Sequence, residues 1–535
     1  MTVREQVLDI IEKNALRTFL VDAATGRQVS YLEFHQSACR LAAELRRRGV
    51  VRGDRLGVMV PNCCELAVVY FACFYAGAVI VPINPNLSVN DVRFILTTCN
   101  PRLVIASRTV IERIAVTGTA VVPLATEQDS VATVDSGGID LAVLPAAEGF
   151  NLLEKTSDDD LLVIVYTSGT TAKPKGLAHR IGGMFHNARG FAAMQGIDSA
   201  SRFYLTLSMA YMGGFYNLLL LPFLLGASVV IDHVFDARSA LNFWDRASRN
   251  GVNALWLAPT VMSILSKMDR GHVGEEFCRR SVRHAFVGFA PLPVKLKEDF
   301  ENRYGLQLVE NYGLSETLFV TARSRAIRIG AGYVGEPLPG IELRILGEDG
   351  SLLASGADGE IQVLSPDLMA GYLDDRGHLQ NVEAGTWFAT GDYGHLDDVG
   401  SLSVTGRKKD LIIRGGVNIS PAAIEEVLLH AKGIADAAVV SIPHELYGED
   451  IVAVLKLEPG VELESILEAV MMQAKQDLAA HQQPARYVAI DEFPRTANGK
   501  VQKVQLRELV LGKLQIGSGT SFFRSRPAEP AKASV

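Results

Sequence analysis

Cysteine is scarce in this chain of 535 residues, and its pattern excludes two common uses of the residue. The six cysteines form no CxxC pair and show none of the clustered cysteine and histidine spacing that a zinc site needs. Scattered thiols of this kind are typical of reduced, mostly buried residues, so we expect a reducing compartment. They are Cys39, Cys63, Cys64, Cys73, Cys99 and Cys278.

Long apolar runs are also missing. Residues 1–14 carry charges every few positions, so they cannot form the apolar stretch of a signal peptide. The most apolar run, 215–231, is short for a membrane span of about 20 residues and is interrupted by polar residues, Pro222 and Gly226. A buried helix ending near Pro222 and Gly226, followed by the strand ASVVI, fits this run better. We therefore expect a cytoplasmic protein with no integral membrane segment.

An excess of positive charge is absent too. The formal net charge is −8, so the chain as a whole has no electrostatic reason to bind nucleic acid or an anionic membrane. Apolar residues make up 48% and charged residues 21% of the sequence, as in an ordinary globular protein. At about 150 residues per domain, a chain of this length folds into roughly three or four units.

Short apolar runs alternate with helical patterns from residue 1 to about 320, which predicts parallel sheets covered by helices. From 325 to 405, short strands separated by Gly- and Asp-rich turns predict a small antiparallel β unit. Mixed α/β patterns resume after the polar segment GRKKD. We predict an α/β fold (mixed α+β) with a large N-terminal domain, 1–407, hinged to a small α/β C-terminal domain, 408–515. The composition of 516–535 predicts a flexible tail.

The strongest chemical signal is segment 166–176, YTSGTTAKPKG, which continues the apolar strand LLVIVY. Hydroxyls and exposed backbone N–H groups suit a polyphosphate, and lysines neutralise its charge. No Gly-Lys pair is followed by Ser or Thr, so this is not a Walker A loop. Composition alone allows a solvated Ser/Thr loop equally well. The residues predicted to hold phosphate are Thr167, Ser168, Gly169, Thr170, Thr171 and Lys175.

This loop resembles the phosphate-binding signature of the adenylate-forming superfamily, which includes acyl-CoA synthetases, peptide-synthetase adenylation domains and luciferases. The family usually has Gly where Ala172 stands, and the added methyl group restricts the loop. The following GLAHRIGG resembles the version found in acetyl-CoA synthetases. Further segments resemble the family's other motifs and occur in the same order, namely 311–317 (NYGLSET), 387–392 (WFATGD), 406–410 (GRKKD) and 494–500 (PRTANGK).

The resemblance implies that the large domain binds ATP and Mg²⁺. The ring of Tyr312 would stack on adenine, and Asp392 would accept hydrogen bonds from both ribose hydroxyls. Arg407 would contact the ribose and phosphate. Glu316 and Thr167 would hold Mg²⁺, because hard cations prefer oxygen ligands. The other residues expected around the nucleotide are Gly288, Ala290, Asn311, Gly313 and Ser315.

The small domain would deliver Lys500, which the resemblance places between the attacking carboxylate and the α-phosphate. A cation there lowers the repulsion between two anions and stabilises the charge of the transition state. Lys409 occupies the family's pivot position, and rotation about it would remove Lys500 before the second half-reaction. Gly415 and Gly416 lie in the segment that would then line the path of the thiol.

The implied activity is formation of an acyl-adenylate with release of pyrophosphate, followed by transfer of the acyl group to a thiol, that of CoA. A carrier protein acting in trans or an amine is an alternative acceptor. A luciferase-like oxidase or a non-catalytic nucleotide-binding relative is an alternative of another class. The residues Glu316, Asp392, Arg407 and Lys500 are all present, which argues against an inactive protein. The chain would act as a monomer or a homodimer.

Two segments resemble parts of the family that contact the acyl chain. Segment 207–214 has Ala210-Tyr211 where many family members have Phe-His, so Tyr211 is a candidate gate of the acyl pocket, together with Gly213 and Gly214. In 288–291 Phe289 replaces a residue that is usually small, which predicts a shorter or narrower pocket. We therefore expect a short, medium or cyclic/aromatic acid rather than a long fatty acid, although core packing explains either aromatic side chain equally well.

Overall fold

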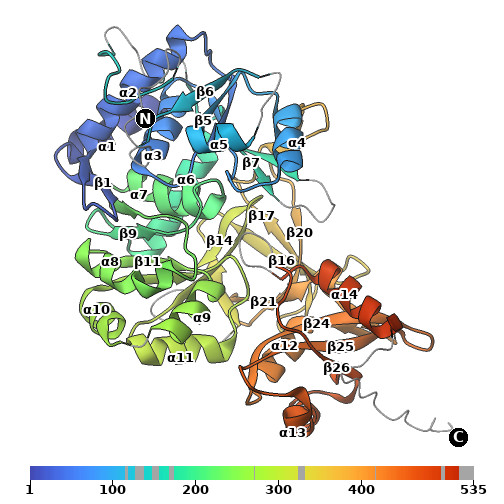
Figure 1. Ribbon diagram of the computed structural model, residues 1–535. Coiled ribbons are helices and arrows are strands. Elements are labelled where there is room, and N and C mark those ends of the chain that lie inside the picture. Colours follow the sequence, from blue (N-terminus) through green and yellow to red (C-terminus); the bar gives the residue numbers. More distant parts are fainter. Residues whose placement is uncertain are drawn as a thin grey trace, which may run out of the picture.

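The computed structural model describes residues 1–114, 119–126, 138–147, 153, 156–167, 174–269, 271–322, 332–415, 417–495 and 501–516. A large N-terminal domain lies beside a smaller C-terminal domain, which is orange and red in Figure 1. The fold is mixed α/β, as predicted from the alternation of strand and helix patterns. No helix in the described residues combines the length and apolarity needed to cross a membrane.

The first sheet of the large domain has eight strands in the order β19-β18-β8-β7-β4-β3-β5-β6. Its parallel half is β3 (Arg55–Met59), β4 (Val79–Pro82), β5 (Leu103–Ser107), β6 (Val121–Leu124) and β7 (Leu161–Thr167). Its antiparallel half is β8 (Lys175–Arg180), β18 (Gly371–Leu373) and β19 (Leu379–Asn381). The helices that contact this sheet are α3 (Cys64–Tyr75), α4 (Val89–Cys99) and α5 (Arg108–Arg113). Helix α2 (Tyr31–Arg47) packs between α3 and the second sheet, and α1 (Val3–Asn14) packs against α2.

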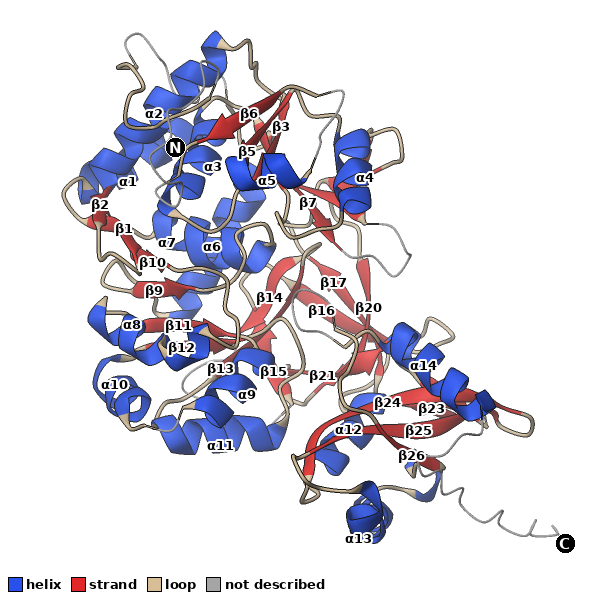
Figure 2. Cartoon of the chain, viewed as in Figure 1, coloured by secondary structure: helices blue, strands red, loops and turns tan. Residues whose placement is uncertain are grey.

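The second sheet has thirteen strands, and the strands from the first part of the chain are mostly parallel. Its parallel strands are β1 (Thr18–Asp22), β10 (Ser228–Ile231), β9 (Arg202–Leu205), β11 (Ala254–Leu257), β12 (His284–Val287) and β13 (Val309–Leu314), and β2 (Gln28–Ser30) pairs antiparallel with β1. Helices α8–α11 lie over β9, β11 and β12 (Figure 2). These helices are α8 (Phe243–Arg249), α9 (Pro259–Met268), α10 (Val273–Ser281) and α11 (Val294–Tyr304), with the 3-10 turn η2 (Ser239–Leu241) before them.

Most strands of the predicted small β unit continue this second sheet instead of standing apart from it, and only β18 and β19 join the first sheet. The antiparallel strands are β14 (Leu318–Ala322), β15 (Tyr333–Pro337), β21 (Leu402–Arg407), β20 (Phe388–Leu396), β17 (Gly359–Leu364) and β16 (Glu342–Leu346). Pairing of β13 with β14 joins the two parts, because the chain reverses tightly after Leu314. This continuity places Tyr312, Asp392 and Arg407 on strands of one sheet.

The apolar run 215–231 forms a helix followed by a strand, as expected, but the helix is of an unusual kind. A π-helix, η1 (Gly213–Leu220), leads into the single turn α7 (Leu221–Leu224), and β10 follows. The N–H of Leu221 donates to the carbonyl of Tyr216, which gives the wider turn directly before Pro222, a residue without an N–H. Helix α6 (Ile181–Gln195) packs against α7 and β14.

The C-terminal domain has a five-stranded sheet in the order β23-β22-β25-β24, with β26 beside β25. Its strands are β22 (Ile412–Arg414), β23 (Val417–Ile419), β24 (Ile434–His444), β25 (Gly448–Leu457) and β26 (Arg486–Ala489). Its helices are α12 (Pro421–Leu429), α13 (Leu463–Asp477) and α14 (Lys503–Ile516), with the 3-10 turns η3 (Lys408–Asp410) and η4 (Ala480–Gln482). The predicted tail lies outside the described residues, apart from Ile516 at the end of α14.

Candidate active site

A buried carboxylate lies at the centre of the candidate site. Asp392, on β20, accepts a hydrogen bond from the hydroxyl of Tyr312 on β13 (2.7 Å) and pairs with Nε of Arg407 on β21 (3.1 Å). Its own N–H donates to the Thr390 hydroxyl (3.0 Å). Burial first, and the charge of Asp392 second, raise the pKa of Tyr312 well above its usual range. The phenol is therefore a neutral donor that holds one carboxylate oxygen in place.

Beside this cluster is an unpaired hydrogen-bond acceptor. Oδ1 of Asn311 is buried and has no hydrogen-bond partner among the described residues. Gly288, the residue after β12, leaves space next to this oxygen, because an added Cβ would lie 3.2 Å from it. A buried amide oxygen without a partner costs free energy unless a ligand satisfies it. An exocyclic amino group of a base, reaching Asn311 past the bare Gly288 backbone, would do so.

The predicted Mg²⁺ ligand Glu316 belongs to a second cluster. One of its carboxylate oxygens accepts a hydrogen bond from the Tyr372 hydroxyl on β18 (2.7 Å), and Nζ of Lys175 lies 5.9 Å from the centre of the Tyr372 ring. Burial, followed by the charge of Glu316, raises the pKa of Tyr372. Sequence reasoning missed Tyr372, because one tyrosine in a Gly-Tyr-Leu strand has no spacing that sets it apart.

The composition of this cluster fits Mg²⁺. Within the described part of the chain, no three His, Cys, Asp or Glu side chains come together as a metal-binding group. Mg²⁺ commonly keeps several waters and is held by one or two carboxylates together with substrate phosphates, so a complete protein cage is not required. Glu316 is half-buried and uses one oxygen towards Tyr372, and Thr167, at the end of β7, is half-buried too.

A cavity of about 370 Å³ opens beside Lys175 and Tyr372. On its wall, the hydroxyls of Thr98 and Tyr166 are hydrogen-bonded to each other at 2.7 Å. Two acids, Asp374 and Asp375, also line it, so the charge of Lys175 faces both hydroxyls and carboxylates. The remaining lining residues are Phe94, Pro174, Gly176 and Leu373.

A second residue that sequence reasoning missed is His179 on β8. Its ring is buried, and Nε2 donates a hydrogen bond to the carbonyl of Ser315 (2.6 Å). Burial lowers the pKa of His179 to about 4, so the ring is neutral at neutral pH. This bond ties the strand after the phosphate loop to the turn that carries Glu316, and it orients Ser315 through its backbone.

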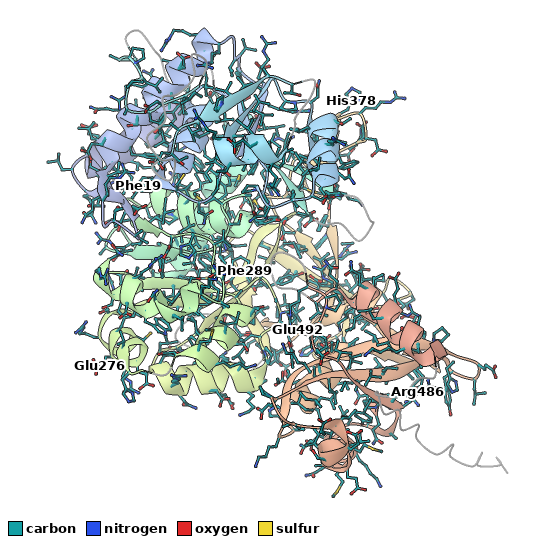
Figure 3. The ribbon with its side chains drawn as sticks, viewed as in Figure 1. Phe19, Glu276, Phe289, His378, Arg486 and Glu492 are labelled. Carbon is teal, nitrogen blue, oxygen red and sulfur yellow. The ribbon has the colours of Figure 1, made fainter. Side chains whose placement is uncertain are left out.

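Among the residues predicted to contact the acyl group, Phe289 lies against Gly213. A Cβ added to Gly213 would lie 2.7 Å from the Phe289 ring, so only glycine leaves room for it. Phe289 has a φ of 74°, a backbone conformation that glycine adopts more readily, and it lies towards the middle of the molecule (Figure 3). The Tyr211 hydroxyl accepts a hydrogen bond from Asn84 (3.0 Å), and Gly214 approaches the backbone of Ser208 too closely for any Cβ.

Other predicted residues lie around these clusters or outside the described residues. Ala290 is half-buried beyond Phe289, and Gly313 follows Tyr312 at an irregularity of the β13–β14 pairing. Lys409 is exposed in η3, directly after Arg407. The predictions for Ser168, Gly169, Thr170, Thr171, Gly416 and Lys500 lie outside the described residues.

Comparison with known proteins gives matches over almost the whole chain. The family model of the AMP-binding enzymes matches residues 8–373, and the model of the AMP-binding enzyme C-terminal domain matches residues 423–500. The chain is 31% identical over 499 residues to an indoleacetate–CoA ligase of Aromatoleum aromaticum, covering 91% of this chain and 94% of the relative. It is 29% identical over 503 residues to a sulfoacetate–CoA ligase of Cupriavidus necator, covering 92% and 94%.

Among solved structures, the chain is similar to ATP-bound MatB from Rhodopseudomonas palustris. The TM-score is 0.83 at 26% identity, and the match covers 95% of this chain and 99% of MatB. The arrangement of two unequal domains therefore has a solved counterpart that contains ATP.

Proposed function

Because the chain belongs to the AMP-binding enzyme family, we propose that it is an AMP-forming acid–thiol ligase with CoA as its acceptor. The observation that carries this proposal is the cluster of Asp392, Tyr312 and Arg407 beside the unpaired Oδ1 of Asn311. A charged acceptor suits the ribose diol and an amide oxygen suits the adenine amino group. The indoleacetate and sulfoacetate ligases that the chain resembles are CoA ligases.

In the first half-reaction, an oxygen of the substrate carboxylate forms a bond to the α-phosphorus of ATP. The bond from that phosphorus to the bridging oxygen breaks, and pyrophosphate leaves with the electron pair. Lys175 neutralises phosphate charge, and Lys500 would contact both the carboxylate and the α-phosphate. Mg²⁺, held by Glu316 and Thr167, would neutralise further phosphate charge when bound.

In the second half-reaction, the thiolate of CoA forms a bond to the acyl carbon. The bond from that carbon to the phosphate oxygen breaks, and AMP leaves with the electron pair. The small domain would rotate about Lys409 and withdraw Lys500, so that the segment containing Gly415 could approach the acyl group. Arg407 and Asp392, which are paired on neighbouring strands of the large domain, would keep AMP oriented in both steps.

The acid is expected to be short, medium-length, cyclic or aromatic. Phe289 occupies the space beside Gly213, which shortens the region available to an acyl chain. Two of the relatives are named for acids of this kind, the bicyclic indoleacetate and the short sulfoacetate.

The test is pyrophosphate release from ATP and Mg²⁺ across a panel of carboxylic acids without acceptor. Benzoate, indoleacetate or octanoate should be activated faster than palmitate, and faster palmitate activation would contradict the substrate class. Adding CoA, a phosphopantetheine-bearing carrier protein or an amine to the best acid then identifies the acceptor. K500A should lose pyrophosphate release but still form the thioester from supplied acyl-AMP and CoA.

A further inference from the structure

A carboxylate of the small domain lies at the N-terminus of a helix in the large domain. Glu426, on α12, accepts a hydrogen bond from the N–H of Val294 (2.9 Å), the first residue of α11. Helix α11 has Pro293 at its N-cap, no side-chain cap and no acidic residue in its first turn. The N–H groups of a first turn have no partner within the helix, and the helix dipole favours a negative charge there. The other domain therefore supplies the cap that α11 lacks.

This contact depends on how the domains are oriented. Glu426 is half-buried, and burial raises its pKa while the hydrogen bond from Val294 opposes that change. Burying a carboxylate is unfavourable unless hydrogen bonds replace water, and here the replacement comes from the large domain. Any rotation that moves α12 away from α11 breaks the bond and returns both groups to water. The contact thus stabilises the orientation seen here over others.

In this orientation, side chains near the tip of the hairpin formed by β22 and β23 are exposed, as far as the structure describes them. Ile413 and Val417 are 54% and 45% exposed, and Gly415 between them is exposed as well. In the proposed second half-reaction this segment would line the path of the thiol and would therefore be covered. The orientation with Glu426 on α11 is thus distinct from the one that the second half-reaction requires.

Helix α11 also continues directly from the loop that forms one side of the candidate site. Gly288, beside Asn311, and Phe289, beside Gly213, lie a few residues before Val294. A contact that holds the first turn of α11 therefore restrains the end of this loop. The loop from Gly288 to Val294 therefore links the orientation of the small domain to the predicted adenine and acyl sites.

We propose that Glu426 is a positioning residue, which holds the small domain in the orientation of the first half-reaction and must release α11 before the second. This inference rests on the proposed function. Removing the side chain in E426A should slow pyrophosphate release about three- to tenfold, the range expected for losing one capping or helix-dipole contact. Thioester formation from supplied acyl-AMP and CoA should stay unchanged or become faster. E426Q keeps an acceptor oxygen without the charge, so its loss should be smaller.

The matched control is E425Q, the adjacent residue on the same helix. Glu425 accepts from the N–H of Val439 and pairs with Lys503, both within the small domain. E425Q removes the same charge but leaves the interdomain contact intact, so the ratio of the two half-reaction rates should equal that of the wild type. An equal loss of both half-reactions in E426A, or no change in either, would overturn the proposal.

A second measurement does not depend on catalysis. Trypsin should cut the exposed segment Arg407-Lys408-Lys409 between the domains, and a loosened domain contact should expose it further. E426A should be cut several-fold faster than wild type and E425Q, all as full-length folded chains. Equal rates in the three proteins would overturn the role of Glu426 whatever the activity. Absence of pyrophosphate release in the wild type with every acid, by contrast, would count against the proposed function alone.

Discussion

At the residue scale, His179 is a fully buried side chain with one hydrogen-bond partner at the candidate site. Its ring is buried to 1% exposure between β8 and the turn that follows β13, and Nε2–H donates to the Ser315 carbonyl. A neutral ring satisfies this acceptor, whereas protonation would place a charge in a buried site. His179 is therefore a structural link whose strength depends on pH.

The free energy of unfolding should decrease as the pH falls, because of His179. Burial lowers the pKa of folded His179 from 6.5 to about 4, so below pH 6.5 the unfolded chain takes up a proton that the folded chain does not. Unfolding then becomes more favourable as pH falls, by roughly 3 kcal/mol between pH 6.5 and 4. In H179Q the amide keeps a donor near the position of Nε2 but cannot titrate. Denaturant unfolding of both proteins at several pH values should show their difference in free energy shrinking as pH falls. Parallel curves would contradict the buried, neutral histidine.

A second prediction at this scale concerns Asp392. D392N keeps the shape of the side chain but removes the charge that faces Arg407 and the acceptor strength offered to Tyr312. Losing a hydrogen bond to a charged group costs about 1.5–3 kcal/mol, so the KM for ATP should rise about 10- to 100-fold. The control is D398N, an exposed carboxylate in the turn after β20. Equal KM values for ATP in D392N and D398N would contradict a role of Asp392 in nucleotide binding.

These residues differ in how far sequence alone could predict them. The motifs with Tyr312, Asp392 and Arg407 were recognisable, and the structure brings their side chains together. Tyr372 and His179 were not, because each acts on a residue far away in the sequence, Glu316 and Ser315 respectively. Only the pairing of β8 with β18, and the turn after β13, reveal these partners.

At the element scale, the turn between β13 and β14 controls the position of both clusters. The strand register shifts between Tyr312 and Gly313, and Leu318 adopts a φ of 59° at the start of β14. The backbone N–H of Leu314 donates to the Thr317 hydroxyl, which closes the turn locally (3.0 Å). This short segment carries Tyr312 on one side and Glu316 on the other, so its conformation sets the separation of the nucleotide base and the metal ligand.

The turn should tolerate no side chain at Gly313. A Cβ there would lie 2.1 Å from the carbonyl oxygen of Leu318, which is backbone and cannot turn aside. G313A should lower the free energy of unfolding by about 1–3 kcal/mol, as overpacking does, and should slow pyrophosphate release as well. G190A is the control, because Gly190 lies within α6 with nothing within 4 Å of an added Cβ. G190A should be slightly more stable than wild type. Denaturant unfolding of G313A and G190A measures the difference in their free energies of unfolding.

Local sequence patterns predicted which segments form helices or strands, but they did not predict how the strands pair into sheets. The alternation of apolar runs correctly predicted parallel strands with helices between them, because each strand must bury both faces. The antiparallel strands after residue 332 were also predicted, yet their merger with the parallel sheet depends on β13 pairing with β14, which hydrophobic patterning does not encode. The π-turns of η1 likewise have no pattern distinct from an ordinary buried helix.

At the scale of the whole molecule, the hydrophobic cores of the two domains are separate. The buried clusters of the large domain extend no further than Leu402, and those of the small domain begin at Ile412. Two of the contacts that cross the junction are polar: Glu426 with Val294, and the Ser420 hydroxyl with the Thr405 carbonyl. The domain boundary at 407 and 408 was predicted from turn chemistry and remains a prediction.

Separate cores joined by polar contacts should unfold in two steps. Differential scanning calorimetry of the full chain should show two transitions, because the buried clusters of the two domains are separate. AMP should raise only the transition of the large domain, which contains Asn311, Tyr312 and Asp392. At a concentration 100 times its Kd, the ligand should add about 2.7 kcal/mol to the stability of that domain. Adenine-free ribose 5-phosphate is the control and should shift it less, since it leaves Oδ1 of Asn311 without a partner. A single transition that AMP shifts as a whole would mean that the interface, including Glu426, couples the domains more strongly than their separate cores imply.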